Sequence, residues 1–183
     1  MKKIISVVAF FLIIAIHLIF LTSILFEKIN TTWVVLGVIL ITAMITYSYY
    51  HSSTEQEDHF LIDLQDIFYI AIGGVTTYFL NVDLKLGAVI AAGITGTLAA
   101  LIPYLKPKSN TFKRIPLTVY CGAFVGMSQP NVASGYSFIL FACFLTGILF
   151  IGAKNLFNGF GGKLGTLAFG GVAFASLLIY LFL

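Results

Sequence analysis

Long apolar runs, separated by short polar breaks, recur along the whole chain. Each run is close to the roughly 20 residues that an α-helix needs to cross the hydrocarbon core of a bilayer. The runs are predicted to be helices, because the apolar–polar alternation of a membrane β-barrel is absent. The pattern therefore predicts an all-α polytopic transmembrane helix bundle with seven spans, at about 4–26, 32–50, 61–80, 84–105, 115–131, 135–153 and 164–183.

Composition agrees with this pattern. Of the 183 residues, 60% are hydrophobic and 9% are charged, whereas soluble domains carry about 25% charged residues. We therefore expect residues 1–183 to form a single integral membrane domain with no soluble part. The first run is expected to remain as a helix, because it is longer than the apolar region of a signal peptide and lacks a small-residue cleavage site.

The basic residues predict the orientation of the spans, because cytoplasmic loops are enriched in lysine and arginine. We expect a bacterial inner-membrane protein with a cytoplasmic N-terminus and an external C-terminus. An alternative makes residues 115–127 a re-entrant hairpin, which would place Lys154 and Lys163 outside. With seven crossings, the inner segments hold Lys2, Lys3, Lys106, Lys108, Lys113, Arg114, Lys154 and Lys163, and the outer segments hold only Lys28 and Lys85.

A weak internal repeat relates the two halves of the chain. The triplet Lys-Leu-Gly begins at Lys85 and again at Lys163, and a shift of 78 residues gives nine identities between residues 60 and 105. The shift pairs three spans with three spans, so the halves would run through the membrane in opposite senses, as in many transporters. The prediction is an inverted repeat of residues 32–105 and 106–183 behind an N-terminal helix, 1–31. Coincidence in so biased a composition is the alternative.

Small residues four apart predict where helices approach closely, because helices in lipid associate through small side chains. The fourth span carries such a stripe, and the last span carries another around Thr166 and Ala175. We expect these two spans to cross near a pseudo-two-fold axis, although either stripe could instead face another subunit. The packing residues are Ala88, Ala92, Gly93, Gly96, Gly170 and Gly171.

Ionisable residues inside apolar spans are costly and are therefore candidates for a transport or ion pathway. His17 lies near the middle of the first span and could relay protons, or simply bond to a neighbouring helix. His59, Asp63 and Asp66 fall on one helical face at the start of the third span. Such a set could bind a cation, but acidic residues are also stabilised at any helix N-terminus.

A polar break follows the fifth span. It contains Ser128, Gln129 and Asn131 around a proline that removes a helix hydrogen bond, so free carbonyls could coordinate a solute. A plain outer turn is the alternative.

Several chemistries are excluded. The stretch FGGKLGTLAFGG, residues 160–171, has neither P-loop nor dinucleotide-fold spacing. Cys121 and Cys143 lie inside apolar runs, so no disulfide framework or CxxC metal site is predicted. No catalytic set, metal site or cofactor site can be proposed, and the dispersed charge gives no nucleic-acid signal. We expect a protein that is not an enzyme.

The sequence thus favours a small membrane transporter or channel that passes a small solute or ion. Because 183 residues are few to enclose a pathway, a homo-oligomer in the lipid bilayer is expected. The alternative is a non-transporting membrane subunit that binds a partner protein or lipid through the basic cytoplasmic loop, residues 106–114.

Overall fold

The computed structural model describes residues 2–28, 31–51, 64–153 and 162–182. These residues contain helices and no strand, so the all-α prediction is confirmed for the described chain. The elements are α1 (Lys2–Lys28), α2 (Thr32–His51), α3 (Leu64–Tyr78), η1 (Phe79–Asp83), α4 (Ala88–Leu101), η2 (Ile102–Leu105), α5 (Asn110–Gly126), α6 (Tyr136–Gly152) and α7 (Lys163–Phe182).

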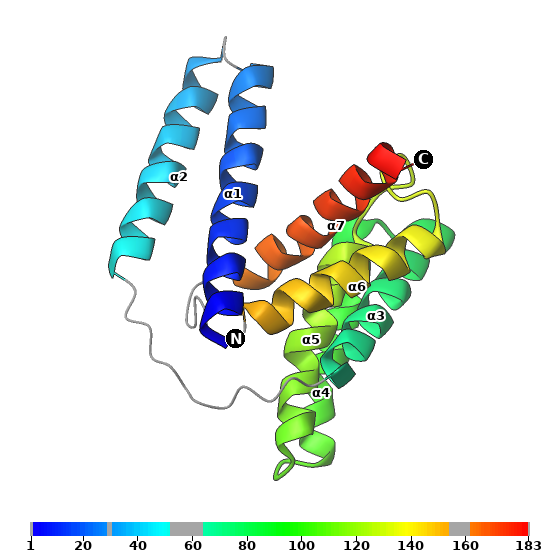
Figure 1. Cartoon of the computed structure of the whole chain (residues 1–183). Helices are drawn as coiled ribbons and strands as arrows, with labels where there is room; N and C mark the ends of the chain where they lie inside the picture. The colour runs from blue at the N-terminus through cyan, green and yellow to red at the C-terminus, as the bar shows by residue number, and fades with distance from the viewer. Residues whose placement is uncertain (1, 29–30, 52–63, 154–161, 183) are drawn as a thin grey trace. The chain divides into compact units, whose positions relative to one another are not determined.

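The described helices form two compact units. In one unit, α1 and α2 pack against each other as a hairpin (Figure 1). In the other, α5 contacts α3, α4, α6 and α7 and is therefore the central helix. The predicted inverted repeat places α2 in the same half as α3 and α4. Because α2 belongs to a different compact unit, the structure does not test the repeat, and it stays a prediction.

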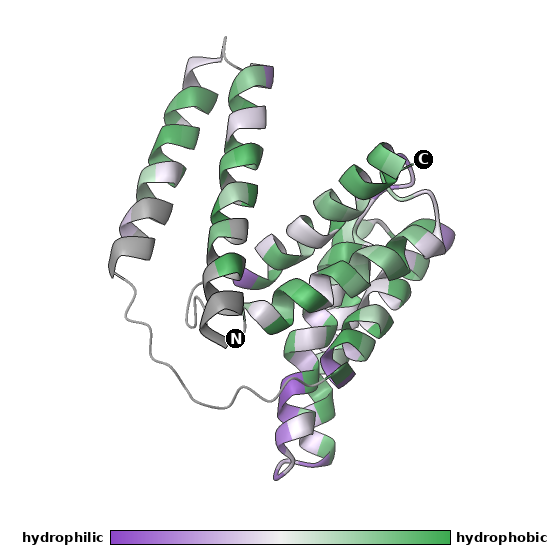
Figure 2. Cartoon of the chain, viewed as in Figure 1, coloured by the Kyte–Doolittle hydropathy of each residue, from purple (hydrophilic) through white to green (hydrophobic). Residues whose placement is uncertain are grey.

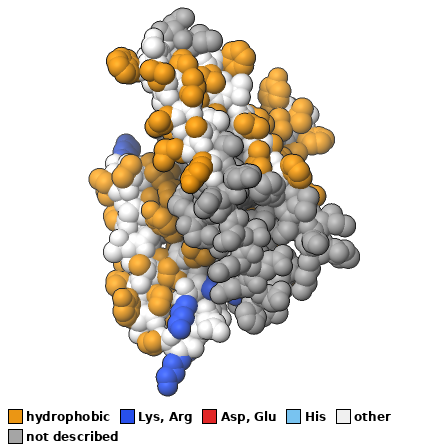
Figure 3. All heavy atoms as spheres, turned by 90° about the vertical axis from the view of Figure 1, so that its left-hand side faces the viewer, with side chains coloured by type: hydrophobic (Ala, Val, Ile, Leu, Met, Phe, Trp, Pro, Cys, Tyr) orange, Lys and Arg blue, Asp and Glu red, His pale blue; other side chains and the backbone are white. Residues whose placement is uncertain are grey.

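Two helices are long and apolar enough to cross a membrane within the described residues, namely Ala88–Leu105 and Lys163–Phe182. Shorter apolar helices cover Ile14–Glu27, Thr32–Met44 and Tyr136–Gly152. Apolar residues dominate most helices, while hydrophilic residues gather at the start of α5 (Figure 2). Apolar side chains also lie on the surface of the described chain (Figure 3). An apolar helical protein is thus established, and the number of crossings stays a prediction.

The central helix α5 is continuous. Pro116 lies inside it and cannot donate the usual backbone hydrogen bond, yet the helix runs on to Gly126. A re-entrant hairpin over residues 115–127 is therefore wrong, because the segment has no internal turn. The polar break that suggested the hairpin lies beyond the helix C-terminus.

The closest helix contact joins α3 to α5 through glycines. A Cβ atom added to Gly122 would lie 1.9 Å from the carbonyl oxygen of Ile70, and one added to Gly126 would lie 2.3 Å from that of Gly74. On the other side, a Cβ atom at Gly73 would lie 2.1 Å from the Val119 carbonyl oxygen. Contacts advance along both helices in the same direction, so α3 and α5 run parallel with their backbones touching.

The predicted small-residue stripes pack on other partners than expected. In α4, Ala92 is buried and a Cβ atom at Gly96 would lie 2.7 Å from the ring of Tyr120 in α5, while Gly93 is exposed with open space around it. In α7, Gly170 and Gly171 are buried, and α7 packs along α6 and α5. Within the described residues α4 and α7 form no extended contact, so the expected crossing of these two spans is wrong.

Candidate functional site

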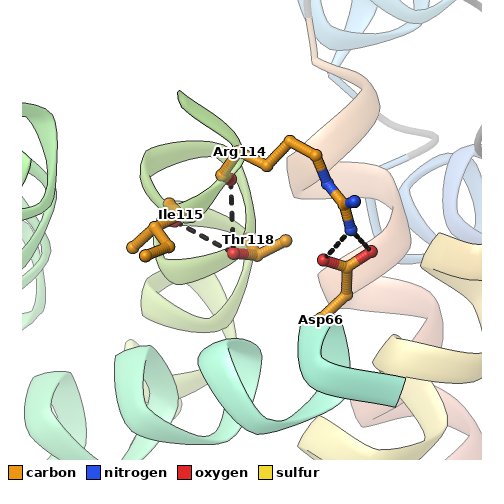
Figure 4. A network of polar contacts seen from close by, with 4 residues as sticks. All are labelled: Asp66, Arg114, Ile115 and Thr118. Carbon is orange, nitrogen blue, oxygen red and sulfur yellow. Dashed lines mark hydrogen bonds and ion pairs between the residues drawn. The ribbon is translucent and has the colours of Figure 1, made fainter. Parts of the chain in front are cut away.

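Asp66 is the one charged side chain among the buried described residues. It lies in the first turn of α3 and is 2% exposed. Its carboxylate accepts hydrogen bonds at both oxygens from the guanidinium of Arg114 in α5 (Figure 4). The Arg114 side chain is 31% exposed, so it reaches the buried acid from the edge of the bundle.

The backbone carbonyls at and after Arg114 are contacted by a threonine hydroxyl one turn later in α5. The hydroxyl of Thr118, which is 1% exposed, donates to the carbonyl of Ile115 at 2.9 Å and approaches that of Arg114 at 3.4 Å (Figure 4). The hydroxyl thus reaches back across Pro116, which has no N–H of its own, to the two carbonyls that precede the proline. They fix the start of α5 where it faces Asp66.

Electrostatics favours this pairing. The first turn of a helix attracts negative charge, and Asp66 lies at the first turn of α3. A buried carboxylate also needs an opposite charge with good geometry, which a planar guanidinium supplies. Arg114 is the only arginine in the sequence, and no acidic residue follows Asp83.

The other end of the α3–α5 pair holds a separate polar cluster. η1 is a π-helical turn in which the N–H of Leu84 bonds to the Phe79 carbonyl at 3.0 Å. Within this turn, the side-chain amide of Asn81 donates to the carbonyls of Gly126 and Ser128, both at 3.4 Å. The wider turn of a π-helix aims Asn81 at the C-terminus of α5, where carbonyls lack helix partners.

Tyrosines complete this second cluster. The hydroxyl of Tyr78 donates to the carbonyl of Ala133 at 3.2 Å, and that of Tyr136 donates to the carboxylate of Asp83. The two rings meet edge to face, with centroids 5.2 Å apart. The cluster therefore ties the end of α3 to the segment between α5 and α6.

The predicted pathway residues fall in different places. Ser128, Gln129 and Asn131 lie in the turn after α5; Ser128 donates to the Val125 carbonyl at 2.8 Å, while Gln129 and Asn131 are exposed. Asp66 is at the opposite end of the helix pair, roughly 20 Å away at a rise of about 1.5 Å per residue. The structure does not bring these two sets together. His59, Asp63 and the side chain of His17 lie outside the described residues.

Sequence reasoning missed Arg114 and Asn81 as parts of these clusters. Arg114 was assigned to a basic loop that controls topology, and it lies 48 residues from Asp66, so no local spacing connects the two. The available signal was that an acid inside an apolar span needs a counterion. Asn81 had no comparable signal, because its role depends on the π-helical turn.

Neither cluster has the composition of a metal site. Among the described residues, no group of three or more histidine, cysteine, aspartate or glutamate side chains could hold a metal ion. The cluster of Asp66 and Arg114 offers an ion pair. The cluster around Asn81, Tyr78 and Tyr136 offers amide, hydroxyl and carbonyl groups.

Comparison with known proteins gives no relative for this chain: no family model matches it, and no match was found among curated proteins or solved structures.

Proposed function

We propose that the protein is a small membrane transporter or channel that passes a small solute or ion across the bacterial inner membrane. The observation that carries this proposal is the ion pair between the buried carboxylate of Asp66 in α3 and the partly exposed side chain of Arg114 in α5. Charged residues in such surroundings are costly and mark ion and substrate pathways by default. A pair that only stabilised the fold could be replaced by apolar side chains at little cost.

Polar side chains recur on the buried face of α3, beyond an apolar stretch that contains Ile70, Gly73 and Gly74. Thr77 donates to the hydroxyl of Thr95 in α4 at 2.9 Å, and both side chains are buried. Asn81 follows one turn later, at the second polar cluster. Asp66, Thr77 and Asn81 therefore share one face of this helical segment, at separations that bring helical residues to the same side. The tight glycine contact of α3 with α5 keeps this face closed between its two ends.

The placement in the membrane is part of the proposal. Seven crossings put Asp66 and Arg114 near the cytoplasmic surface and Asn81 and Ser128 near the outer surface, with the C-terminus outside. The parallel direction of α3 and α5, with α4 between them in sequence, supports three successive crossings. A homo-oligomer is proposed because one chain of this size is small to enclose a pathway.

Flux in proteoliposomes tests the proposal. The purified chain is reconstituted alone, and its flux is followed with urea and glycerol by vesicle swelling and with potassium and protons by trapped dyes. At least one probe should move faster than in empty vesicles, and Asp66→Asn should lower that flux, because the carboxylate charge is the proposed contact for the solute. Thr22→Ser, in α1, is the matched control and should keep the flux.

A second function is favoured by one observation, the exposure of Lys106 and Lys108 before α5 and of Lys113 in its first turn. A non-transporting subunit that binds a partner there would give no flux alone with any probe. Flux that is unchanged in Asp66→Asn would also contradict the assigned role of the pair.

A further inference from the structure

The turn between α4 and α5 is a compact, hydrogen-bonded structure. After η2, the N–H of Ser109 bonds to the Lys106 carbonyl at 3.1 Å, and the N–H of Lys113 bonds to the Ser109 carbonyl at 3.2 Å. The ammonium group of Lys106 lies 5.5 Å from the centre of the Phe112 ring, within range of a cation–π contact. We call residues 104–113 the basic hairpin. Its backbone is ordered by its own hydrogen bonds and holds its lysines at one end of α4 and α5.

The basic hairpin has positive charge without a described counterion. Lys106, Lys108 and Lys113 are exposed, and none forms an ion pair with a described carboxylate. The adjacent Arg114 is already engaged by Asp66. Figure 3 shows basic side chains projecting at the lower end, where Figure 1 places this turn, and no acidic side chain on that face of the described chain. No carboxylate among the described residues therefore neutralises this charge.

Exposed apolar side chains lie directly beside these lysines and indicate that the hairpin contacts a membrane surface. Tyr104 is 79% exposed and Leu105 is 76% exposed, and both immediately precede Lys106. Leu101, one turn earlier, is also exposed. An exposed tyrosine and leucines followed by lysines match the depth profile of a membrane interface, where tyrosine lies at the headgroups and lysine reaches outward. A soluble acidic protein would leave these apolar side chains without a partner.

We propose that the basic hairpin binds the headgroups of anionic lipids in the leaflet that surrounds it. The ammonium groups of Lys106, Lys108 and Lys113 would contact lipid phosphates, while Tyr104 and Leu105 lie among the upper acyl chains. Lys106, positioned over Phe112, is the lysine with the most restricted place. The inference rests on the membrane placement in the proposed function and is independent of transport.

Lipid titration of the full-length chain in detergent micelles tests the proposal. Fluorescently labelled phosphatidylglycerol is compared with phosphatidylcholine that carries the same acyl chains and label. The natural sequence should bind phosphatidylglycerol roughly tenfold more tightly at low salt, given the usual effect of several interfacial lysines. Added salt should reduce this preference, because exposed charges are screened.

Three variants make the result specific. The triple variant Lys106→Gln, Lys108→Gln, Lys113→Gln should lose the preference, and replacement of the same three lysines by arginine should keep it. Lys85→Gln, which removes an exposed lysine at the opposite end of α4, should also keep it. Equal affinity for both lipids in the natural sequence would overturn the proposal, and so would a preference that survives in the triple glutamine variant. Because flux does not enter this measurement, loss of lipid preference and loss of transport are separable.

Discussion

Gly122 in α5 shows how little space single side chains have at the α3–α5 contact. A methyl group there would lie 1.9 Å from a backbone oxygen of α3, and backbone atoms cannot rotate away as a side chain can. We expect Gly122→Ala to lower the free energy of unfolding by about 3 kcal/mol, at the upper end of usual overpacking costs. Thermal unfolding can be followed with a thiol-reactive dye, because both cysteines are fully buried.

Gly93 in α4 is the matched control. It is also a helical glycine, but nothing lies within 4 Å of a Cβ atom built on it. Gly93→Ala should leave stability unchanged or raise it by up to about 1 kcal/mol, since alanine is the better helix former. A similar loss in both variants would mean that helix propensity and not close packing explains the effect.

The Asp66–Arg114 pair should behave as one unit. Asp66→Asn removes the carboxylate charge that faces the guanidinium, and Arg114→Gln removes the guanidinium that faces a buried carboxylate, so each single variant should lose about 2 to 4 kcal/mol of stability. The double variant should lose less than the sum of the two. The same thiol-dye unfolding measurement gives all four values. Additive losses would mean that the two side chains act independently.

Part of this site was predictable from sequence. Asp66 was identified because a carboxylate inside an apolar run is rare and costly. Its partner was not identified, because helix periodicity relates residues three or four apart and says nothing about residues on different helices. The close helix contacts were also predicted only in part. The stripe of small residues in α4 is visible in the sequence. The closest contact between helices instead uses glycines that this pattern did not select, namely Gly73, Gly74, Gly122 and Gly126.

Helix α5 illustrates what hydropathy does and does not locate. The predicted span was 115–131, whereas the helix is Asn110–Gly126. Hydropathy reports which residues suit a hydrocarbon environment, and the polar first turn of α5 is helical without being apolar. The spans 135–153 and 164–183 agree closely with α6 and α7, because there apolar character and helix begin together.

The hydrogen bonds of Asn81 in η1 to the end of α5 can be tested by substitution. Asn81→Ala removes the amide that bonds to the carbonyls after Gly126, so we expect a stability loss of about 1 kcal/mol for these long hydrogen bonds. Backbone amides near Ser128 should exchange with deuterium faster, as measured by mass spectrometry. Asn131→Ala, in the exposed turn nearby, should change neither quantity, and an equal effect there would contradict the role given to Asn81.

The arrangement of the complete chain in the membrane can be tested by cysteine accessibility. In a Cys121→Ala, Cys143→Ala background, single cysteines are placed at Ser53, Lys85, Lys108, Asn131 and Asn158 and labelled from either side of the membrane. Seven crossings require labelling from inside, outside, inside, outside and inside, in that order. Labelling of Lys108 and Asn131 from the same side would contradict a crossing by α5, and external labelling of Asn158 would contradict a crossing by α6.

The parallel packing of α3 on α5 has a consequence for synthesis. Arg114 follows Asp66 by 48 residues, so at roughly 5 to 20 residues per second the ribosome makes the arginine some 2 to 10 seconds after the aspartate. In the proposed topology α3 therefore reaches the membrane first, carrying an acid whose counterion does not yet exist. Its position near the start of α3 keeps that acid close to cytoplasmic water during the interval. When α5 inserts, Arg114 reaches Asp66, and the ion pair forms as α3 takes its final position in the membrane.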